Sequence, residues 1–299
     1  MKNWIKYIRL VLFVGIIAFA IFKCGDLYSR IKVYEFKAQP FLFIVLFVFI
    51  SFAVQALLTK TIVSFCDKKI KLSSALGINV MGGLMGILLP FGSVAYKAIH
   101  LKNKYNIDIS AYSSFYGLSF LCSLVASVLS ILIVSLFASK VSVSIWCIFA
   151  IVVFIICFLS INWFGEKFPF LKDKNVLRSV FNDERKKYSV YFIAIHLLSL
   201  VNYILIYKAC LSFLDINISF LMLGLLVAIQ NIMFLAPIVP GNFGFLEYAA
   251  IIVLGSNDIH DLDIALAVLL MRFVMLASLV FLASIRMSFN FIYKEKALS

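Results

Sequence analysis

Residues 237–251 read Pro-Ile-Val-Pro-Gly-Asn-Phe-Gly-Phe-Leu-Glu-Tyr-Ala-Ala-Ile and interrupt the otherwise apolar stretch 218–254. Proline lacks the backbone N–H that a helix needs, and glycine is conformationally free, so a helix is expected to break here. Inside a bilayer, the backbone groups freed by a break are tolerated only where protein or water satisfies them. The stretch therefore predicts either a re-entrant hairpin or two short spans, placed inside a helical bundle or beside a wet cavity.

The composition of the whole chain predicts a membrane protein. Of the 299 residues, 64% are hydrophobic and only 14% are charged, whereas a soluble domain carries about 25% charged residues. The mean hydropathy is +1.08. These values exclude an ordinary globular enzyme, a disordered chain and a disulfide scaffold. The six cysteines show no Cys-x-x-Cys spacing, so we expect buried free thiols and no metal site.

Six apolar runs are each long enough to cross the bilayer, which takes about 20 residues. No small-residue cleavage site follows the first run, so we interpret it as an uncleaved span. A second broken region, residues 73–99, is interrupted at Pro90-Phe91-Gly92. We therefore predict an all-α polytopic membrane protein, a single integral domain over residues 1–299, with about six full spans and two Pro/Gly-broken re-entrant or short paired helical elements. The six runs are residues 4–22, 41–58, 112–137, 142–162, 189–211 and 264–286.

The basic residues predict the orientation of the chain. The formal net charge is +13, which in a soluble protein would suggest nucleic acid. Here the basic residues lie between the apolar runs. About twenty of the 27 Lys and Arg fall on one side if each broken region returns to the side it entered from. Because cytoplasmic loops carry the excess of Lys and Arg, both termini are expected in the cytoplasm, and no nucleic-acid partner is expected.

The two breaks resemble each other in sequence. Residues 91–99 (Phe-Gly-Ser-Val-Ala-Tyr-Lys-Ala-Ile) and 243–251 (Phe-Gly-Phe-Leu-Glu-Tyr-Ala-Ala-Ile) are identical at five of nine positions, and a proline precedes each. In the predicted orientation the first break opens to the cytoplasm and the second to the outside, which is the pattern of an inverted repeat with units 41–137 and 189–286. Transporters commonly place their site where such repeats meet. The alternative is chance similarity between two segments of a chain that uses few residue types.

Two charged residues fall in segments that are predicted to lie inside the bilayer, where a charge is energetically unfavourable. Arg272 falls inside the last apolar run, where a charge costs at least about 2.5–3.5 kcal/mol on insertion scales. Glu247 lies in the second broken region, and we expect the two side chains to face each other or to share a wet cavity. Arg272 could neutralise Glu247, bind a substrate phosphate, or extend alone toward the headgroups. The first two roles are compatible if Glu247 holds Arg272 until an anion displaces it.

The second break itself offers features of an anion site. A helix that restarts after Gly244 presents unpaired N–H groups and the positive end of its dipole. Gly241 and Gly244 have no Cβ, so an anionic group such as a lipid phosphate could approach the backbone closely. A proline kink needed only for packing is the alternative. At the first break, Lys97 and Tyr96 fall near the cytoplasmic headgroups, where Lys97 could collect a phosphate or simply anchor the chain.

Other polar and small residues predict packing rather than chemistry. Gly82-x-x-x-Gly86 lets helices approach closely, and Asn79, Gln230 and Asn231 are expected to form hydrogen bonds between helices. His196 and Tyr203 are seven residues apart and share a helix face. The sequence shows no Ser-His-Asp set, paired catalytic carboxylates, phosphate loop or metal-ligand cluster. We therefore expect no enzymatic activity, no metal and no cofactor.

Residues 237–249, followed by Arg272 in a span, resemble the lysylphosphatidylglycerol synthase transmembrane region, the flippase-like module of the multiple peptide resistance factor. Gly241, Gly244, Glu247 and Arg272 match that family's motif, while Asn242 stands in place of its second glycine. Three further residues fit an earlier family motif, whose acidic residue is missing here: Pro90, Gly92 and Lys97.

The resemblance implies two re-entrant elements and lipid translocation in a bacterial inner membrane. The function predicted is a flippase-like transporter for an anionic or phosphate-bearing lipid, either a phospholipid or a polyprenyl-linked glycan. The alternative is a non-transporting partner that presents lipid to a membrane glycosyltransferase. Aminoacyl transfer is not expected, because no sequence is left for the soluble synthase domain. The residues assigned to the substrate are Arg272, Glu247, Gly241, Asn242, Gly244, Pro240, Lys97, Tyr96, Pro90 and Gly92.

Overall fold

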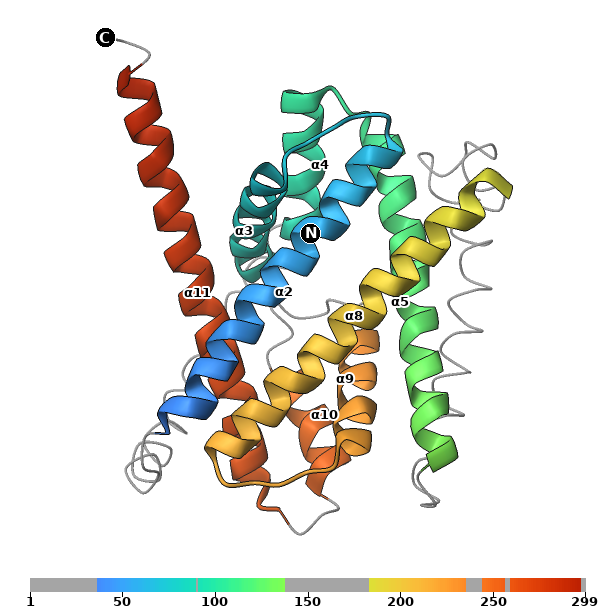
Figure 1. Ribbon diagram of the computed structural model, residues 1–299, viewed down its shortest axis with the longest axis vertical. Coiled ribbons are helices and arrows are strands. Elements are labelled where there is room, and N and C mark those ends of the chain that lie inside the picture. The colour runs from blue at the N-terminus through green and yellow to red at the C-terminus, as the bar shows by residue number, and fades with distance from the viewer. Residues whose placement is uncertain (1–36, 90, 138–182, 235–243, 256–258, 297–299) are drawn as a thin grey trace, which may run out of the picture.

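The computed structural model describes residues 37–89, 91–137, 183–234, 244–255 and 259–296, and all regular secondary structure in these ranges is helical (Figure 1). The expected all-α class is therefore confirmed for this part of the chain. The helices are α2 (Ala38–Phe65), α3 (Leu72–Leu88), α4 (Gly92–Tyr105), α5 (Ile109–Phe137), α8 (Asp183–Phe213), α9 (Phe220–Phe234), α10 (Phe245–Leu254) and α11 (Asp261–Lys296).

Four of these helices, α2, α5, α8 and α11, are long and apolar enough to cross a membrane. They correspond to four of the six predicted runs, and the other two, 4–22 and 142–162, lie outside the described residues. Helix α8 begins six residues earlier than its apolar run. The added residues include Glu184, Arg185 and Lys186, which are strong helix formers.

Both predicted breaks separate helices that pack on each other. Helix α3 ends at Leu88 and α4 begins at Gly92, with Phe91 between them in the left-handed conformation at φ 60°. Helix α9 ends at Phe234, and α10 begins after Gly244, whose φ is +85°. Figure 1 shows the pair α3 and α4 toward one end of the molecule and the pair α9 and α10 toward the other.

The helix contacts of the two halves correspond. Helix α2 packs on α3, α11 and α5, while α8 packs on α9, α5 and α11. Helices α3 and α4 pack together as α9 and α10 do, and α3 contacts α11 as α9 contacts α5. The two halves are α2 to α5 and α8 to α11, and each contact made by a helix of one half has a counterpart in the other half. Helices α2 and α8, the first helix of each half, pack against each other.

The turns that follow α2 and α8 have the same structure. Asp67 and Asp215 both adopt positive φ, 55° and 61°. In each turn a backbone N–H spans five residues to bond the last helical turn: Lys68 N to Val63 O at 3.3 Å, and Ile216 N to Leu211 O at 2.8 Å. The sequences of the two turns are identical at five equivalent positions. These are Lys60, Ser64, Phe65, Asp67 and Ile70 in the first turn, and Lys208, Ser212, Phe213, Asp215 and Ile218 in the second.

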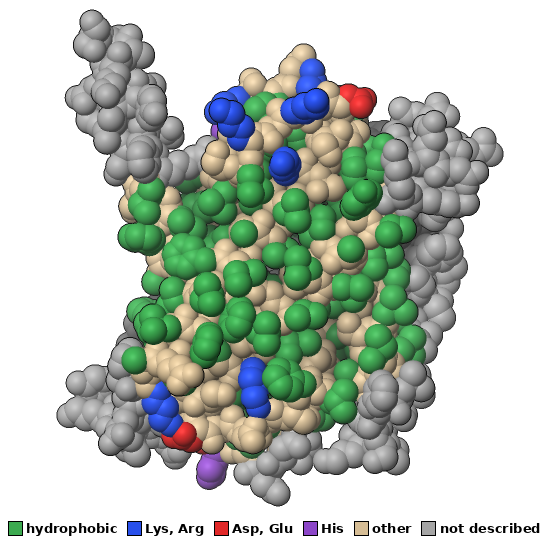
Figure 2. All heavy atoms as spheres, viewed as in Figure 1, with side chains coloured by type: hydrophobic (Ala, Val, Ile, Leu, Met, Phe, Trp, Pro, Cys, Tyr) green, Lys and Arg blue, Asp and Glu red, His purple; other side chains and the backbone are tan. Residues whose placement is uncertain are grey.

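Small residues allow close packing on both faces of α3. A Cβ on Gly83 would lie 2.6 Å from Leu279 Cδ1 of α11, and a Cβ on Gly92 would lie 2.2 Å from the Met85 carbonyl oxygen. A Cβ on Gly82 would lie 3.0 Å from Lys97 Cε, and one on Gly86 would lie 3.2 Å from Ser93 Cβ, so the predicted role of Gly82-x-x-x-Gly86 in tight packing is confirmed. The outer surface is hydrophobic over the middle of the face seen in Figure 2, with Lys and Arg side chains toward both ends. This distribution suits a bundle that crosses a bilayer.

Candidate functional site

Arg272 and Glu247 form a shielded ion pair between α11 and α10. Arg272 Nε lies 3.0 Å from Glu247 Oε1, and the two side chains are 12% and 14% exposed. Arg272 Nη2 also donates to Glu247 Oε2 at 3.3 Å. The expected meeting of these two charges is therefore confirmed. Neutralisation by the neighbouring carboxylate explains how a guanidinium can lie inside an apolar helix.

Glu247 has a second role at the start of α10. Its Oε2 accepts a hydrogen bond from the Gly244 backbone N–H at 2.9 Å, as the third helical residue does in half of a capping box. The helix start was expected to present unpaired N–H groups, and at Gly244 that donor is already occupied by the carboxylate. An anion that approaches α10 must therefore compete with Glu247 for Arg272 and for the Gly244 N–H.

A cavity of about 560 Å³ lies between the two breaks. It brings together Lys97 of α4 and Arg272 of α11, which the sequence placed near different breaks. Its polar lining is completed by Gln55, Asn79, Ser93 and Tyr203. We call this space the central cavity. Its described lining contains two cations and no carboxylate. Glu247 neutralises Arg272 from α10, and the remaining charge of Lys97 favours an anion.

Lys97 reaches the central cavity by lying across α3. A Cβ on Gly82 would lie 3.0 Å from Lys97 Cε and 3.3 Å from Lys97 Cγ, and 3.3 Å from Ser93 Oγ. The missing side chain at Gly82 therefore makes room for the lysine stem. The role of Lys97 as a simple anchor at the headgroups does not describe this position, since the side chain lines the cavity.

The remaining lining of the central cavity is apolar. Phe52 and Leu246 are buried, while Phe273 and Leu276 of α11 are 69% and 44% exposed. The cavity therefore extends from buried and half-buried residues, among them its polar groups, to the exposed hydrophobic face of α11. A molecule with a charged headgroup and an apolar tail matches this gradient.

The other assigned residues are placed differently. Tyr96 does not line the central cavity; its ring stacks on His100 at 5.6 Å between centroids, and its hydroxyl lies 3.5 Å from His100 Nδ1. Gly92 is buried against Met85 and serves the close approach of α3 and α4. Its neighbour Pro90 and the residues Pro240, Gly241 and Asn242 lie outside the described residues.

Asn79, Gln230 and Asn231 form hydrogen bonds between helices, as predicted. Asn79 donates to the Gln55 carbonyl at 3.0 Å and to Thr59 Oγ1 at 2.9 Å. Gln230 donates to the Leu246 carbonyl at 3.0 Å. Asn231 donates to two hydroxyls of α5, Ser123 Oγ at 2.8 Å and Ser127 Oγ at 2.7 Å.

Two lining residues, Gln55 and Ser93, were not assigned from the sequence. Gln55 interrupts the apolar run 41–58, and a polar residue in such a run is a signal for a wet site. Ser93 carries no comparable signal, because serine packs readily between membrane helices.

The pattern of the second break, its ion pair and the surrounding helices agree with a family match. A family model described as "Lysylphosphatidylglycerol synthase TM region" matches residues 7–283. The chain belongs to this family. No curated protein and no solved structure matches the chain. Membership of the lysylphosphatidylglycerol synthase transmembrane family, together with the apolar helices, identifies a multi-pass membrane protein involved in lipid-related processes.

Proposed function

We propose that the protein is a flippase-like transporter, not an enzyme, that moves an anionic or phosphate-bearing lipid across a bacterial inner membrane. The observation that carries the proposal is the central cavity, in which Lys97 of α4 and Arg272 of α11 meet within a largely apolar lining. Family membership supports a role in lipid-related processes.

The chemistry of the cavity suits the two ends of such a lipid. Lys97 and Arg272 donate charge-assisted hydrogen bonds, which are about twice as strong as neutral ones, and both residue types bind phosphate. The exposed rings and methyl groups of Phe273 and Leu276 line the path toward the surface of α11. In the proposed complex the phosphate lies between the two cations and the acyl chains leave past α11.

The helix lengths support re-entrant elements. Helices α3 and α4 have 17 and 14 residues, and α9 and α10 have 15 and 10. At about 1.5 Å per residue none of the four covers a hydrocarbon core of about 30 Å. We propose that the two hairpins enter from opposite sides and that the halves form an inverted repeat. The cytoplasmic side is proposed to be the one bearing the α3–α4 hairpin and both termini.

The ion pair suggests how a headgroup could be held and released. An incoming phosphate takes Arg272 from Glu247, and the carboxylate returns when the phosphate leaves. The Gly244 N–H bond keeps Glu247 in place during this exchange. The guanidinium faces an anion at every stage and is never left unpaired in the apolar interior, while Glu247 keeps the Gly244 hydrogen bond when Arg272 leaves it.

Reconstitution tests the proposal directly. The purified chain is placed in liposomes that contain a trace of fluorescent phosphatidylglycerol, or in a second series a fluorescent polyprenyl phosphate, and a membrane-impermeant quencher reports transbilayer movement. The chain is expected to accelerate movement of at least one probe. Arg272→Leu or Lys97→Leu is expected to slow it about tenfold or more, since hydrogen bonds to charged groups contribute about 1.5–3 kcal/mol.

Lys102 provides the matched control. It lies on α4 like Lys97 but is exposed and does not line the central cavity, so Lys102→Leu should leave the rate unchanged. Equal losses in Lys97→Leu and Lys102→Leu would contradict the assignment of the cavity. Movement that requires a co-purified glycosyltransferase would instead favour a partner that only presents lipid.

A further inference from the structure

The central cavity contains neutral polar groups beside its two cations. Three of these side chains come from three different helices: Gln55 of α2, Ser93 of α4 and Tyr203 of α8. Like Lys97 and Arg272, they are half-buried. The cavity of about 560 Å³ falls within the range of about 300–1,000 Å³ that holds whole small-molecule ligands. A phosphate therefore leaves space in the cavity, and the neutral groups border that space.

Two of the neutral groups are available to a ligand. In the part of the chain that the structure describes, neither the Gln55 amide nor the Ser93 hydroxyl forms a side-chain hydrogen bond. Asn79, by contrast, already donates to the carbonyls of Gln55 and Ala75 and to Thr59 Oγ1. Since polar groups inside a protein normally have a hydrogen-bond partner, the amide and the hydroxyl are suited to bind the substrate.

The available groups are held in place next to the cationic part of the cavity. Ser93 and Lys97 are one turn apart on α4, and both pack over Gly82, where a Cβ would lie 3.3 Å from Ser93 Oγ and 3.0 Å from Lys97 Cε. Gln55 is positioned through its backbone, because its carbonyl accepts from Asn79 of α3 at 3.0 Å. A phosphate bound by Lys97 would therefore have the Ser93 hydroxyl beside it.

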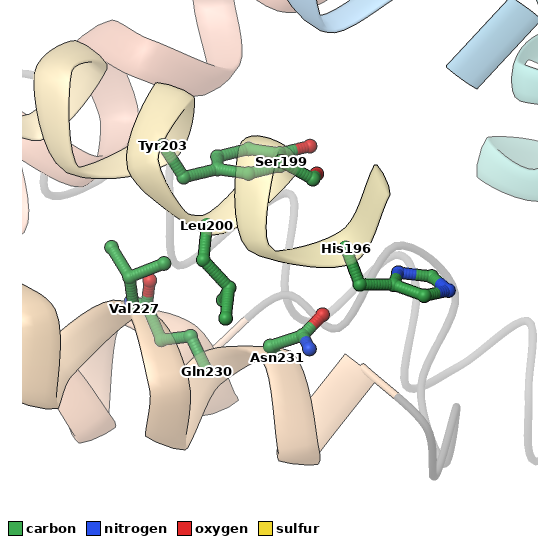
Figure 3. A pocket seen from close by; sticks show the side chains of 7 residues that line it. All are labelled: His196, Ser199, Leu200, Tyr203, Val227, Gln230 and Asn231. Carbon is green, nitrogen blue, oxygen red and sulfur yellow. The ribbon is translucent and has the colours of Figure 1, made fainter. Parts of the chain in front are cut away.

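Tyr203 limits how far a headgroup can extend. The turns at Asp67 and Asp215 are 148 positions apart, and the same offset relates Gln55 to Tyr203, so the two residues occupy equivalent positions of α2 and α8. Beyond Tyr203 lies a pocket of only about 30 Å³ between α8 and α9, which Gln230 lines from the facing helix (Figure 3). This pocket accommodates a water molecule but not a headgroup.

The charges of the cavity are unfavourable for an amine. An ammonium group only donates hydrogen bonds, and its charge needs a compensating anion when it is shielded from water. The described lining contains no carboxylate, and Lys97 would repel the ammonium. Glu247 does not line the cavity, and its oxygens face Arg272 and the Gly244 N–H. Hydroxyl groups both donate and accept, which matches an amide and a serine hydroxyl.

We propose that the central cavity selects a lipid phosphate whose headgroup carries hydroxyl groups and no amine, a selectivity that rests on the proposed transport function. Glycerol in phosphatidylglycerol and a single sugar on a polyprenyl phosphate both have this chemistry. Lys97 and Arg272 bind the phosphate, and Gln55 and Ser93 bind the hydroxyl groups. Lysyl-phosphatidylglycerol, whose headgroup carries ammonium groups, is then a poor ligand of this chain.

Competition binding tests the selectivity. The detergent-solubilised protein binds fluorescent phosphatidylglycerol, and unlabelled lipids displace it. Phosphatidylethanolamine and lysyl-phosphatidylglycerol should compete at least tenfold more weakly than phosphatidylglycerol. A second series uses a fluorescent polyprenyl-phosphate hexose, and the series with the tighter binding identifies the source of the headgroup. Equal competition by phosphatidylglycerol and by both amine-bearing lipids would overturn the proposal.

Gln55→Leu separates recognition of the headgroup from binding of the phosphate. Loss of one neutral hydrogen bond should weaken phosphatidylglycerol about threefold to tenfold. Phosphatidic acid, which has the phosphate but no headgroup, should change less than twofold, and unglycosylated polyprenyl phosphate has the same part in the second series. If the variant weakens both lipids equally, or neither of them, Gln55 does not contact the headgroup.

Gln55→Glu tests the same position by adding a carboxylate to the cavity. Competition by phosphatidylethanolamine should improve at least tenfold relative to phosphatidylglycerol. Gln39 provides the matched control, because it lies on the same helix but is exposed and does not line the cavity. Gln39→Glu should leave the preference unchanged. Glu247→Gln should also leave the preference unchanged, and a weaker competition by phosphatidylethanolamine alone would show that Glu247 serves an amine.

Binding and transport assays distinguish the two ways of failing. If the reconstituted protein moves no lipid but the solubilised protein keeps the preference and its change in Gln55→Glu, the selectivity holds and the transport function fails. If lipids with and without an amine are moved at equal rates and bind equally, transport holds and the selectivity is overturned.

Discussion

At the scale of single residues, the site depends on charges that compensate one another. Glu247 binds both Arg272 and the start of α10, so one carboxylate links the guanidinium to the second break. Lys97 has no such carboxylate among the residues that line the cavity with it. An anion is therefore expected to interact with Lys97 directly and to compete with Glu247 for Arg272.

Because Glu247 and the anion compete for Arg272, the Glu247→Gln variant should bind anionic lipid more tightly than the unchanged protein. The amide oxygen can still accept the Gly244 N–H bond, but its charge no longer holds Arg272. Anionic lipid should bind up to about tenfold more tightly, because removing about 1.4 kcal/mol of competing attraction has that effect. Binding of fluorescent phosphatidylglycerol to the detergent-solubilised protein measures it.

Arg272→Leu is the opposing variant in the same assay and should weaken binding. If Glu247→Gln weakens binding as much as Arg272→Leu, the pair is structural and no exchange takes place. Thermal unfolding of both variants distinguishes a loss of binding from a loss of the fold.

At the scale of helices, close backbone approach shapes the first hairpin. The Cβ-to-oxygen distance of 2.2 Å at Gly92 involves the backbone of Met85, whereas the 2.6 Å distance at Gly83 involves only the end of the Leu279 side chain. A backbone carbonyl cannot rotate away as a leucine methyl group can. The two glycines therefore tolerate substitution to different degrees.

Gly92→Ala is expected to destabilise the protein by about 1–3 kcal/mol, the usual cost of overpacking. Gly83→Ala, with the same chemical change, should cost less than about 1 kcal/mol because Leu279 can adopt another rotamer. Thermal unfolding in detergent compares the two. Equal midpoints for both variants would show that α3 and α4 are not held together at Gly92.

The sequence predicted the helical breaks and the ion pair because each has a local signal. Proline and glycine mark a break wherever they occur in an apolar run, and a charge in such a run requires a partner. The Gly244-x-x-Glu247 spacing could also have predicted the helix cap. Gln55 carried a signal of the same kind, a polar residue in an apolar run. The lining by Ser93 could not be predicted, because it depends on how α4 packs on α3.

At the scale of the whole molecule, the two halves share one arrangement of helices with different side chains at equivalent positions. The shared turn at Asp67 and Asp215 was visible in the sequence and strengthens the repeat. The correspondence of α5 with α11, which begin at Ile109 and Asp261, needed the structure. Counted from these starts, Ser119, Ser123 and Ser127 of α5 correspond to Met271, Met275 and Leu279 of α11, so the side chains give no sign of the repeat.

The proposed topology makes a final prediction about the two hairpins. In a background without the native cysteines, Lys69→Cys lies before the α3–α4 hairpin and Asn103→Cys lies in the last turn of α4. Asn217→Cys and His260→Cys lie before and after α9–α10. All four positions are exposed. A membrane-impermeant maleimide should label positions 217 and 260 in intact spheroplasts, and positions 69 and 103 only after permeabilisation, because Lys and Arg concentrate on the cytoplasmic side. If either hairpin crossed the bilayer once, its two positions would label from opposite sides, and the opposed hairpins that bring Lys97 and Arg272 together would not exist.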